Sequence, residues 1–158
     1  MSSHLAEVAR EKKQQWINFR KKNHSERENW KKKVHELYSK IKQWLMPLES
    51  EGLLRYQEET LPMICISEES GVEERNDLTI KFFNGALIKL ESVDLEVVGA
   101  YGRIDMQLGL RRIMIILLKE EKSEWIFTER YGLEKNPTYD FNQEAFEQIV
   151  TEFVESFS

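Results

Sequence analysis

The first 46 residues contain neither glycine nor proline, whereas the remaining residues hold all 7 glycines and all 3 prolines of the chain. This stretch is rich in Lys, Glu, Gln and Ala, which are good helix formers. After about residue 50 the apolar residues change from a helical period to the period of two that is typical of strands. The sequence therefore predicts an α+β protein in which N-terminal helices precede an antiparallel sheet.

We expect two N-terminal helices, over about residues 3–22 and 26–46. Ser25 followed by Glu28 forms a capping box, in which each side chain can satisfy a backbone N–H of a new helix. Pro47 favours an end to the second helix, because the residue before a proline disfavours helical geometry. The second helix carries a strong amphipathic stripe of apolar side chains, namely Trp30, Val34, Leu37, Tyr38, Ile41, Trp44 and Leu45.

The middle of the chain predicts a twisted antiparallel sheet of about six to eight strands, arranged as hairpins. Asn84-Gly85 lies between two alternating apolar segments, which is a strong signal for a hairpin. The spacings between strands leave no room for crossover helices, so neighbouring strands should be antiparallel. Ile113 to Leu118 is continuously apolar, and we expect this strand to be central, with both of its faces covered.

The C-terminal segment predicts an amphipathic helix that packs on the sheet. Asp140 or Asn142 can cap its first turn. Six large apolar groups on one helix face need a surface to cover, and the sheet supplies one. These groups are Phe146, Ile149, Val150, Phe153, Val154 and Phe157.

The charge of the chain is divided unevenly along its length. The net charge is −5, but residues 1–46 hold 12 Lys/Arg and 5 Asp/Glu, whereas residues 47–158 hold 11 Lys/Arg and 23 Asp/Glu. A length of 158 residues suits one domain. We therefore expect one structural domain with a basic helical arm (1–46) and an acidic body of sheet and helix (47–158). Such a split can mark a nucleic-acid-binding arm or two faces for different partners, or the arm can lie on its own body.

Features of targeting and of membrane proteins are missing from the sequence. The start has no apolar signal-peptide core. The longest apolar run, Ile113 to Leu118, falls far short of the roughly 20 residues that span a bilayer. We expect a cytoplasmic protein with no membrane partner. Cys65 lies in an apolar run and is expected to be a buried small hydrophobe.

The usual catalytic and metal-binding motifs do not occur. The three histidines, His4, His24 and His35, all lie in the basic arm, and none pairs with another at a metal-ligand spacing. The chain has no Gly-rich phosphate loop and no G-x-S-x-G elbow. Adjacent glutamates such as Glu58-Glu59 point to opposite faces of a strand, so they are not natural acid/base pairs. The sequence predicts no catalytic, cofactor-binding or metal-ligating residues, and we expect a protein that is not an enzyme.

The tryptophans of the arm suggest a contact surface. Trp16, Trp30 and Trp44 are spaced by two heptads, so they lie close to one face if the helix is continuous. This face could form a helical hairpin or coiled coil with a partner or with a second copy of the chain, or it could pack on the protein's own sheet. We favour packing on the sheet for the second helix and leave both alternatives open for the first.

A second candidate contact surface lies in the body. Tyr101, Arg103 and Asp105 alternate with apolar residues that we expect in the core, so they should point outward together. Arg103 and Asp105 could be a simple surface ion pair, but an aromatic beside an arginine is also a common composition of binding hot spots. The candidate partner-binding residues are Trp16, Trp30, Tyr101, Arg103 and Asp105.

The sequence favours a protein that works by contact. Its layout resembles that of small bacterial proteins with a tryptophan-bearing helical start, a meander of strands and a closing helix. We expect a non-enzymatic module for protein–protein interaction, such as an inhibitor or an immunity or antitoxin-like protein, because acidic inhibitors use charge to capture basic targets. The alternative is a nucleic-acid-associated protein that neutralises phosphates through its basic helices. The residues for this alternative are Lys12, Lys13, Arg20, Lys21, Lys22, Lys31, Lys32 and Lys33.

Overall fold

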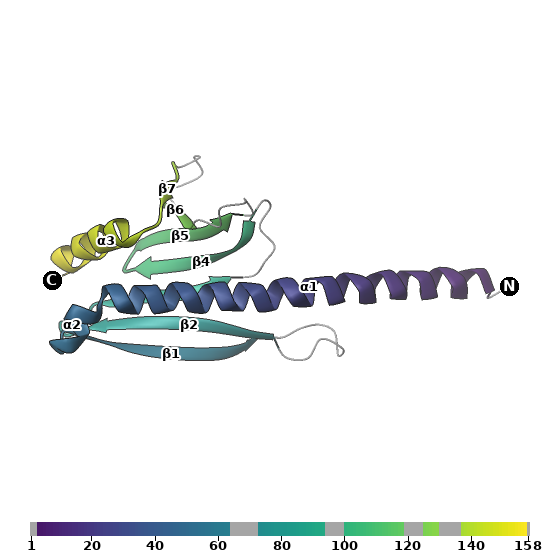
Figure 1. Cartoon of the computed structure of the whole chain (residues 1–158), viewed down its shortest axis with the longest axis horizontal. Coiled ribbons are helices and arrows are strands. Elements are labelled where there is room, and N and C mark those ends of the chain that lie inside the picture. The colour runs from purple at the N-terminus through teal and green to yellow at the C-terminus, as the bar shows by residue number, and fades with distance from the viewer. Residues whose placement is uncertain (1–2, 64–72, 94–99, 119–124, 130–136, 158) are drawn as a thin grey trace.

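The computed structural model shows an antiparallel sheet crossed by one long helix, which extends well past the sheet (Figure 1). It describes residues 3–63, 73–93, 100–118, 125–129 and 137–157. The helices are α1 (Ser3–Trp44), α2 (Met46–Ser50) and α3 (Gln143–Ser156). The strands are β1 (Leu54–Met63), β2 (Glu73–Phe82), β3 (Leu87–Val93), β4 (Ala100–Leu108), β5 (Arg111–Leu118), β6 (Trp125–Glu129) and β7 (Tyr139–Asp140).

The seven strands form one sheet whose spatial order is the order of the chain, from β1 to β7. Every neighbouring pair is antiparallel. The predicted α+β class, the strand number and the antiparallel pairing are therefore confirmed. The pairing of β4 with β5 shifts between Ala100 and Gly102, at the end of β4 that lies beside α1.

The prediction of two N-terminal helices is wrong, because α1 is continuous from Ser3 to Trp44. Residues 23–25 are helical, so the capping box at Ser25 does not start a new helix. The physical reason is the cost of nucleation. Once the second half of the helix is fixed, each further residue adds a hydrogen bond without a new nucleus, and Asn, His and Ser cost only a few tenths of a kcal/mol each. Side chains 19–27 lie outside the described residues.

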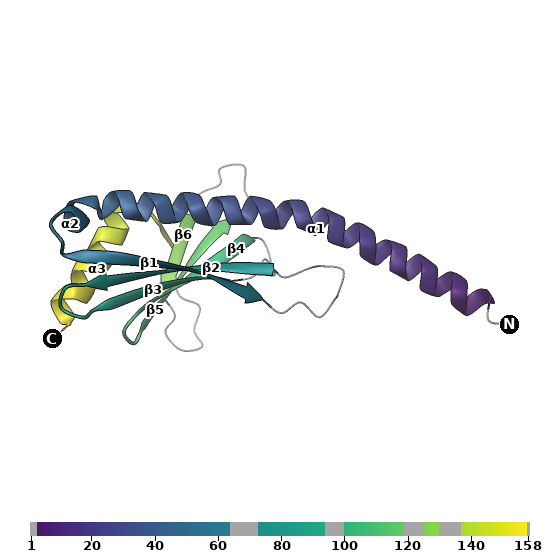
Figure 2. The same ribbon diagram turned by 90° about the horizontal axis from the view of Figure 1, so that it is seen from below.

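The second half of α1 packs on the sheet through the predicted stripe (Figure 2). Val34, Leu37 and Ile41 are at most 1% exposed, and Trp44 is half-buried against the same core. They meet the inward side chains of the central strands, such as Leu78 and Ile104. This apolar interface places α1 on one face of the sheet.

The hydroxyl of Tyr38 ties α1 to strand β2 through a hydrogen bond. The Tyr38 hydroxyl donates to the Asn76 carbonyl at 2.8 Å, and the Ser92 hydroxyl donates to the same oxygen at 3.1 Å. Asn76 directly precedes Asp77, where the β2–β3 pairing begins. Burial raises the pKa of Tyr38 far above its ordinary value, so its hydroxyl keeps the proton that it donates.

Gly102 lets an aromatic ring approach the backbone of β4. A Cβ atom at this position would lie 2.8 Å from the ring carbons of Trp30, closer than such atoms approach one another. The Trp30 ring also packs against Trp125 of β6, with 5.8 Å between the ring centroids. Trp30 is 8% exposed and belongs to the core. The packing of Trp30, in the first turn of α1 that contacts the sheet, therefore requires a glycine at position 102.

Two hairpin turns use glycine differently. The hairpin predicted at Asn84-Gly85 is present, but its loop has three residues, and only Gly85 has a positive φ, +89°. It is thus the longer hairpin type in which a left-handed residue follows an ordinary turn. The β4–β5 hairpin closes through Gly109, at φ +63°, and Leu110. Glycine at the first of two turn positions is typical of a type II′ turn.

The expectation that both faces of the Ile113–Leu118 strand are covered is wrong. In β5, Ile113, Ile115 and Leu117 point into the core, whereas the alternate side chains are half-buried on the other face. Helices α1 and α3 pack on one face only. We call the opposite face the open face, and no described helix packs on it.

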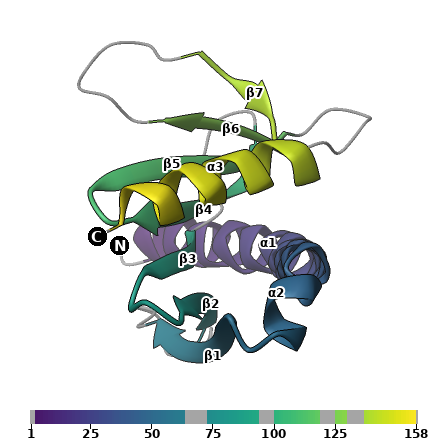
Figure 3. The same ribbon diagram turned by 90° about the vertical axis from the view of Figure 1, so that its left-hand side faces the viewer.

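Helix α3 packs on the same face of the sheet as α1, beside the β4–β5 hairpin (Figure 3). The Asn142 side chain accepts from the Ala145 N–H at 2.9 Å, which confirms one of the two predicted caps. Phe146 of α3 packs against Trp44 of α1, with ring centroids 5.5 Å apart. The predicted apolar stripe is confirmed for four buried residues, Phe146, Ile149, Val150 and Phe153, while Val154 is half-buried and Phe157 is 40% exposed.

The close approach of Trp30 to Gly102 predicts a coupled effect on stability. We expect Gly102→Ala to lower the free energy of unfolding by about 1–3 kcal/mol, because the added methyl overpacks the indole. Trp30→Leu removes the indole, so adding Gly102→Ala to that variant should cost clearly less. A double-mutant cycle from urea unfolding measures the difference. Strictly additive costs would contradict the proposed contact.

The hydrogen bond of Tyr38 predicts a smaller loss. We expect Tyr38→Phe to lower the free energy of unfolding by about 1 kcal/mol, because a buried hydroxyl donor is removed while Ser92 still serves the Asn76 carbonyl. Tyr56→Phe is the matched control, since its hydroxyl is half-buried and lies 3.4 Å from the Lys42 carbonyl. Equal losses in urea unfolding of both variants would show that the Tyr38 contact has no special role.

Candidate interaction surfaces

The first half of α1 runs beyond the sheet without packing on it (Figures 1 and 2). A helix of 42 residues is about 63 Å long, whereas a ten-residue strand spans about 33 Å. No side chain described between Ser3 and Asn29 is buried, and Trp30 is the first buried one among the described side chains of α1. We call residues 3–29 the projecting arm.

The projecting arm exposes both apolar and basic groups. Leu5 is 73% exposed, Val8 40% and Trp16 42%. Arg10, like the candidate nucleic-acid residues Lys12 and Lys13, is exposed on the same helix. The arm therefore offers an amphipathic surface with an excess of positive charge.

The other candidate basic residues divide into two groups. Arg20, Lys21 and Lys22 are placed on the helix, but their side chains lie outside the described residues. In the packed part of α1, Lys31 pairs with Glu28 at 3.5 Å and Lys33 pairs with Glu36 at 3.6 Å, while Lys32 is exposed. Phosphate binding by this set stays a prediction.

Of the two tryptophans of α1 that were predicted to bind a partner, only Trp16 lies on exposed surface. The role of Trp30 in binding a partner stays a prediction, but in this structure its side chain is part of the core. The physical reason is that Gly102 and Trp125 provide an intramolecular site for its ring. The interpretation favoured for the second helix, packing on the protein's own sheet, is the one observed.

Arg103 and Asp105 lie on the open face, as the alternation of β4 predicts. The Arg103 Nε and an Asp105 carboxylate oxygen are 3.2 Å apart, and the two side chains are 33% and 39% exposed. The ion pair is thus half-buried, and neither the Arg103 Nε nor the Asp105 Oδ1 makes a hydrogen bond. The side chain of Tyr101 lies outside the described residues, so the predicted cluster is seen only in part.

A row of carboxylates crosses the open face. Asp77, Glu91 and Asp105 stand directly opposite one another on β2, β3 and β4. Like charges at such positions repel. Each carboxylate therefore has a cation two residues away on its own strand, at 3.0 Å for Arg75–Asp77 and for Lys89–Glu91. Each of these three carboxylates is therefore matched by a cation on its own strand.

Asp77 is the most deeply buried member of this row. It is 3% exposed, and although one carboxylate oxygen accepts from Arg75, Oδ1 is buried without a hydrogen bond. Burial raises the pKa of Asp77 above its ordinary value, and the hydrogen bond from Arg75 offsets only part of this effect. The charged form of Asp77 is therefore disfavoured in the folded protein.

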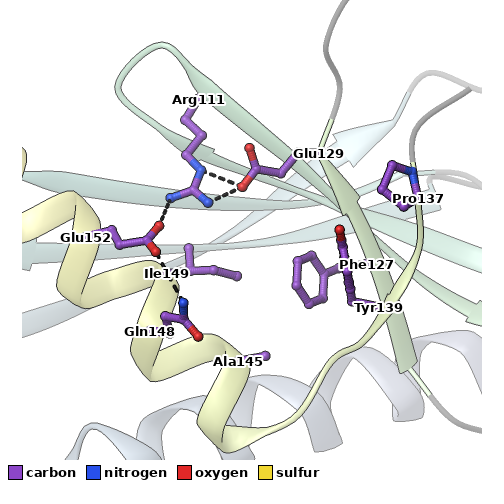
Figure 4. A pocket seen from close by; sticks show the side chains of 9 residues that line it. All are labelled: Arg111, Phe127, Glu129, Pro137, Tyr139, Ala145, Gln148, Ile149 and Glu152. Atoms are coloured by element: carbon purple, nitrogen blue, oxygen red, sulfur yellow. Dashed lines mark hydrogen bonds and ion pairs between the residues drawn. The ribbon is translucent and has the colours of Figure 1, made fainter. Parts of the chain in front are cut away.

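A pocket that the sequence analysis missed lies between α3 and the β6–β7 edge of the sheet (Figure 4). Its volume is about 360 Å³. Arg111, at one end, contacts Glu129 and donates from Nη1 to Glu152 at 2.9 Å. These residues come from β5, β6 and α3, so no local sequence signal joins them. The remaining lining residues are uncharged, namely Phe127, Pro137, Tyr139, Ala145, Gln148 and Ile149.

The described residues hold neither a candidate metal site nor a candidate membrane span. In the described ranges, no group of three His, Cys, Asp or Glu side chains is placed to hold a metal ion. No helix in the described part of the chain is long and apolar enough to cross a membrane. Cys65 lies outside the described residues.

The raised pKa of Asp77 predicts a specific dependence on pH. Folding favours the protonated form, so Asp77 reduces stability as the pH rises above its ordinary pKa. We expect Asp77→Asn to gain stability relative to the wild type between pH 4 and pH 7, measured by urea unfolding at several pH values. Glu11→Gln, at an exposed carboxylate of the projecting arm, is the control. If the wild type instead became more stable relative to Asp77→Asn as the pH rises, the raised pKa of Asp77 would be contradicted.

Comparisons with known proteins give no family for this chain. No protein-family model matches it, and no curated protein and no solved structure matches it either.

Proposed function

We propose that this protein is a module for protein–protein interaction and that its projecting arm binds a partner protein with an acidic surface. The observation that carries this proposal is the extension of α1 past the sheet, with apolar side chains exposed along it. Leu5, Val8 and Trp16 are each at least 40% exposed on this helix. A partner that buried such a helix face would gain about 1.5–3 kcal/mol for each large side chain removed from water.

The composition of the arm favours a protein over a nucleic acid. Leu5 and Val8 occupy the outer end of the helix, where Glu7 and Glu11 lie among the basic residues. Aliphatic groups find no matching surface on a phosphate backbone, and carboxylates are repelled by it. Helix-in-groove recognition of proteins, by contrast, uses apolar anchors at helical spacing.

The excess of basic residues along the arm supplies the second element of recognition. Residues 3–29 contain seven Lys/Arg and four Asp/Glu. A partner with an acidic rim around an apolar groove would match both features, since opposite charges speed encounter and fix orientation. The arm is already helical before a partner binds, because it continues a helix whose second half is fixed on the sheet.

Site-specific photo-crosslinking in cells tests the proposal. A photoreactive amino acid at Val8 should form discrete adducts with a partner protein, because this position is exposed on the arm. Adding Leu5→Asp should reduce these adducts more than tenfold, since an apolar anchor becomes a charge. Adding Lys12→Glu and Lys13→Glu should also reduce them, because the charge of the arm is reversed locally.

The control position is Leu110, which is fully exposed in the β4–β5 hairpin and far from the arm along the chain. The same adducts from Leu110 would show that the contact is not specific to the arm. Nuclease-sensitive adducts alone would instead favour the nucleic-acid alternative. Adducts only with a second copy of this chain would replace the proposed partner by self-association.

A further inference from the structure

We infer that the pocket between α3 and β6–β7 is a binding site for a small organic cation, specifically a primary ammonium group attached to an aromatic body. This site is separate from the projecting arm and does not depend on the function proposed for it. Three features support the inference, and each belongs to a different part of the pocket: its walls, the charge at its end, and its size.

The walls of the pocket suit a flat apolar group. Phe127 and Ile149 form a floor that is 8% and 4% exposed. Tyr139 stands beside Phe127 with ring centroids 5.5 Å apart, and it is 55% exposed (Figure 4). A ligand ring entering here would cover Tyr139 and meet Phe127 in the tilted or offset geometry that aromatic pairs prefer.

The charge at the end of the pocket is negative. One guanidinium, Arg111, lies between two carboxylates, with Nε donating to Glu129 at 2.7 Å and Nη1 donating to Glu152 at 2.9 Å. These three side chains together carry a net charge of −1, and no other lining residue in the described ranges is charged. Helix α3 adds further glutamates and has no Lys or Arg. A cation is favoured in this field and an anion is not.

Glu152 is the member of this group best placed to meet a ligand. Its side chain is 50% exposed, whereas that of Glu129 is 15% exposed. A carboxylate has about four acceptor sites. The bonds from Arg111 Nη1 and from Gln148 Nε2, the latter at 3.4 Å, use two of them. An ammonium group could therefore bind Glu152 without displacing Arg111.

The size of the pocket agrees with a small ligand. Its volume of about 360 Å³ lies at the lower end of the range for ligand pockets. The apolar floor and the charged end lie within this one space (Figure 4). A molecule with a ring at one end and an ammonium group at the other can satisfy both at once.

Titration of the full-length protein by NMR tests this inference. The probes are 2-phenylethylammonium, the neutral 2-phenylethanol and the anionic 3-phenylpropanoate. We expect the cation to shift the amide signals of Tyr139, Ala145 and Gln148, with a dissociation constant of about 0.1–1 mM. The alcohol should bind about tenfold more weakly, and the anion more weakly still.

Matched variants separate the site from general electrostatics. Glu152→Gln should weaken binding of the cation about fivefold to tenfold and leave the alcohol unchanged. Glu155→Gln removes the same charge from α3 at a residue that does not line the pocket, and it should leave both unchanged. Tyr139→Ala should weaken both probes, because it removes an exposed aromatic wall rather than core packing.

Several results would overturn the inference. They are equal binding of the anion, equal weakening by Glu155→Gln, signal shifts confined to other parts of the protein, or no shift at about 10 mM cation. An N-acetyl-lysine amide distinguishes the source of the ammonium group. Tighter binding of this amide than of 2-phenylethylammonium would indicate a peptide side chain in place of an aromatic amine.

Discussion

The packing of the second half of α1 on one face of the sheet is the interaction on which the rest of the molecule depends. Seven apolar side chains, spaced at three and four residues, meet the inward side chains of the strands. An antiparallel meander can leave one face in water, but its other face needs a cover. The stripe of α1 supplies most of that cover, and α3 completes it at the β4–β5 end.

This packing also explains why α1 can project so far. Nucleation is the expensive step in forming a helix, and the packed half provides the nucleus. The remaining residues need only good propensity, and the arm has neither glycine nor proline to interrupt it. A segment with too few apolar groups to fold alone is thereby held in a helical form, at the cost of leaving Leu5 and Val8 exposed.

Local sequence patterns predicted much of the fold, because most helices and turns are marked by residues within the element itself. The stripe of α1, the hairpin at Gly85 and the cap at Asn142 are all local features, and all three are present. The expected break at Ser25 failed because a local capping signal competes weakly with the propagation of a fixed helix.

The two faces of β5 show a different limit of the sequence. An apolar run cannot reveal which elements will cover each side of a strand, because that depends on where distant helices pack. The packing of Trp30 could not be predicted from local sequence either. It requires a glycine at position 102, which is 72 residues away in the chain. The pocket at α3 could not be predicted at all, because Arg111, Glu129 and Glu152 meet only through the tertiary fold.

The two proposed surfaces lie at opposite ends of the molecule, the arm at the N-terminal end and the pocket beside α3 (Figure 1). One aromatic contact links α1 to α3, which forms a wall of the pocket. Trp44, at the end of α1, contacts Phe146 of α3, which directly follows Ala145 in the pocket wall. Because α1 is a single helix, the arm and this contact belong to one continuous element. The distance between the surfaces lets both be occupied at once, and the position of α3, which shapes the pocket, is set by the same stripe that supports the arm.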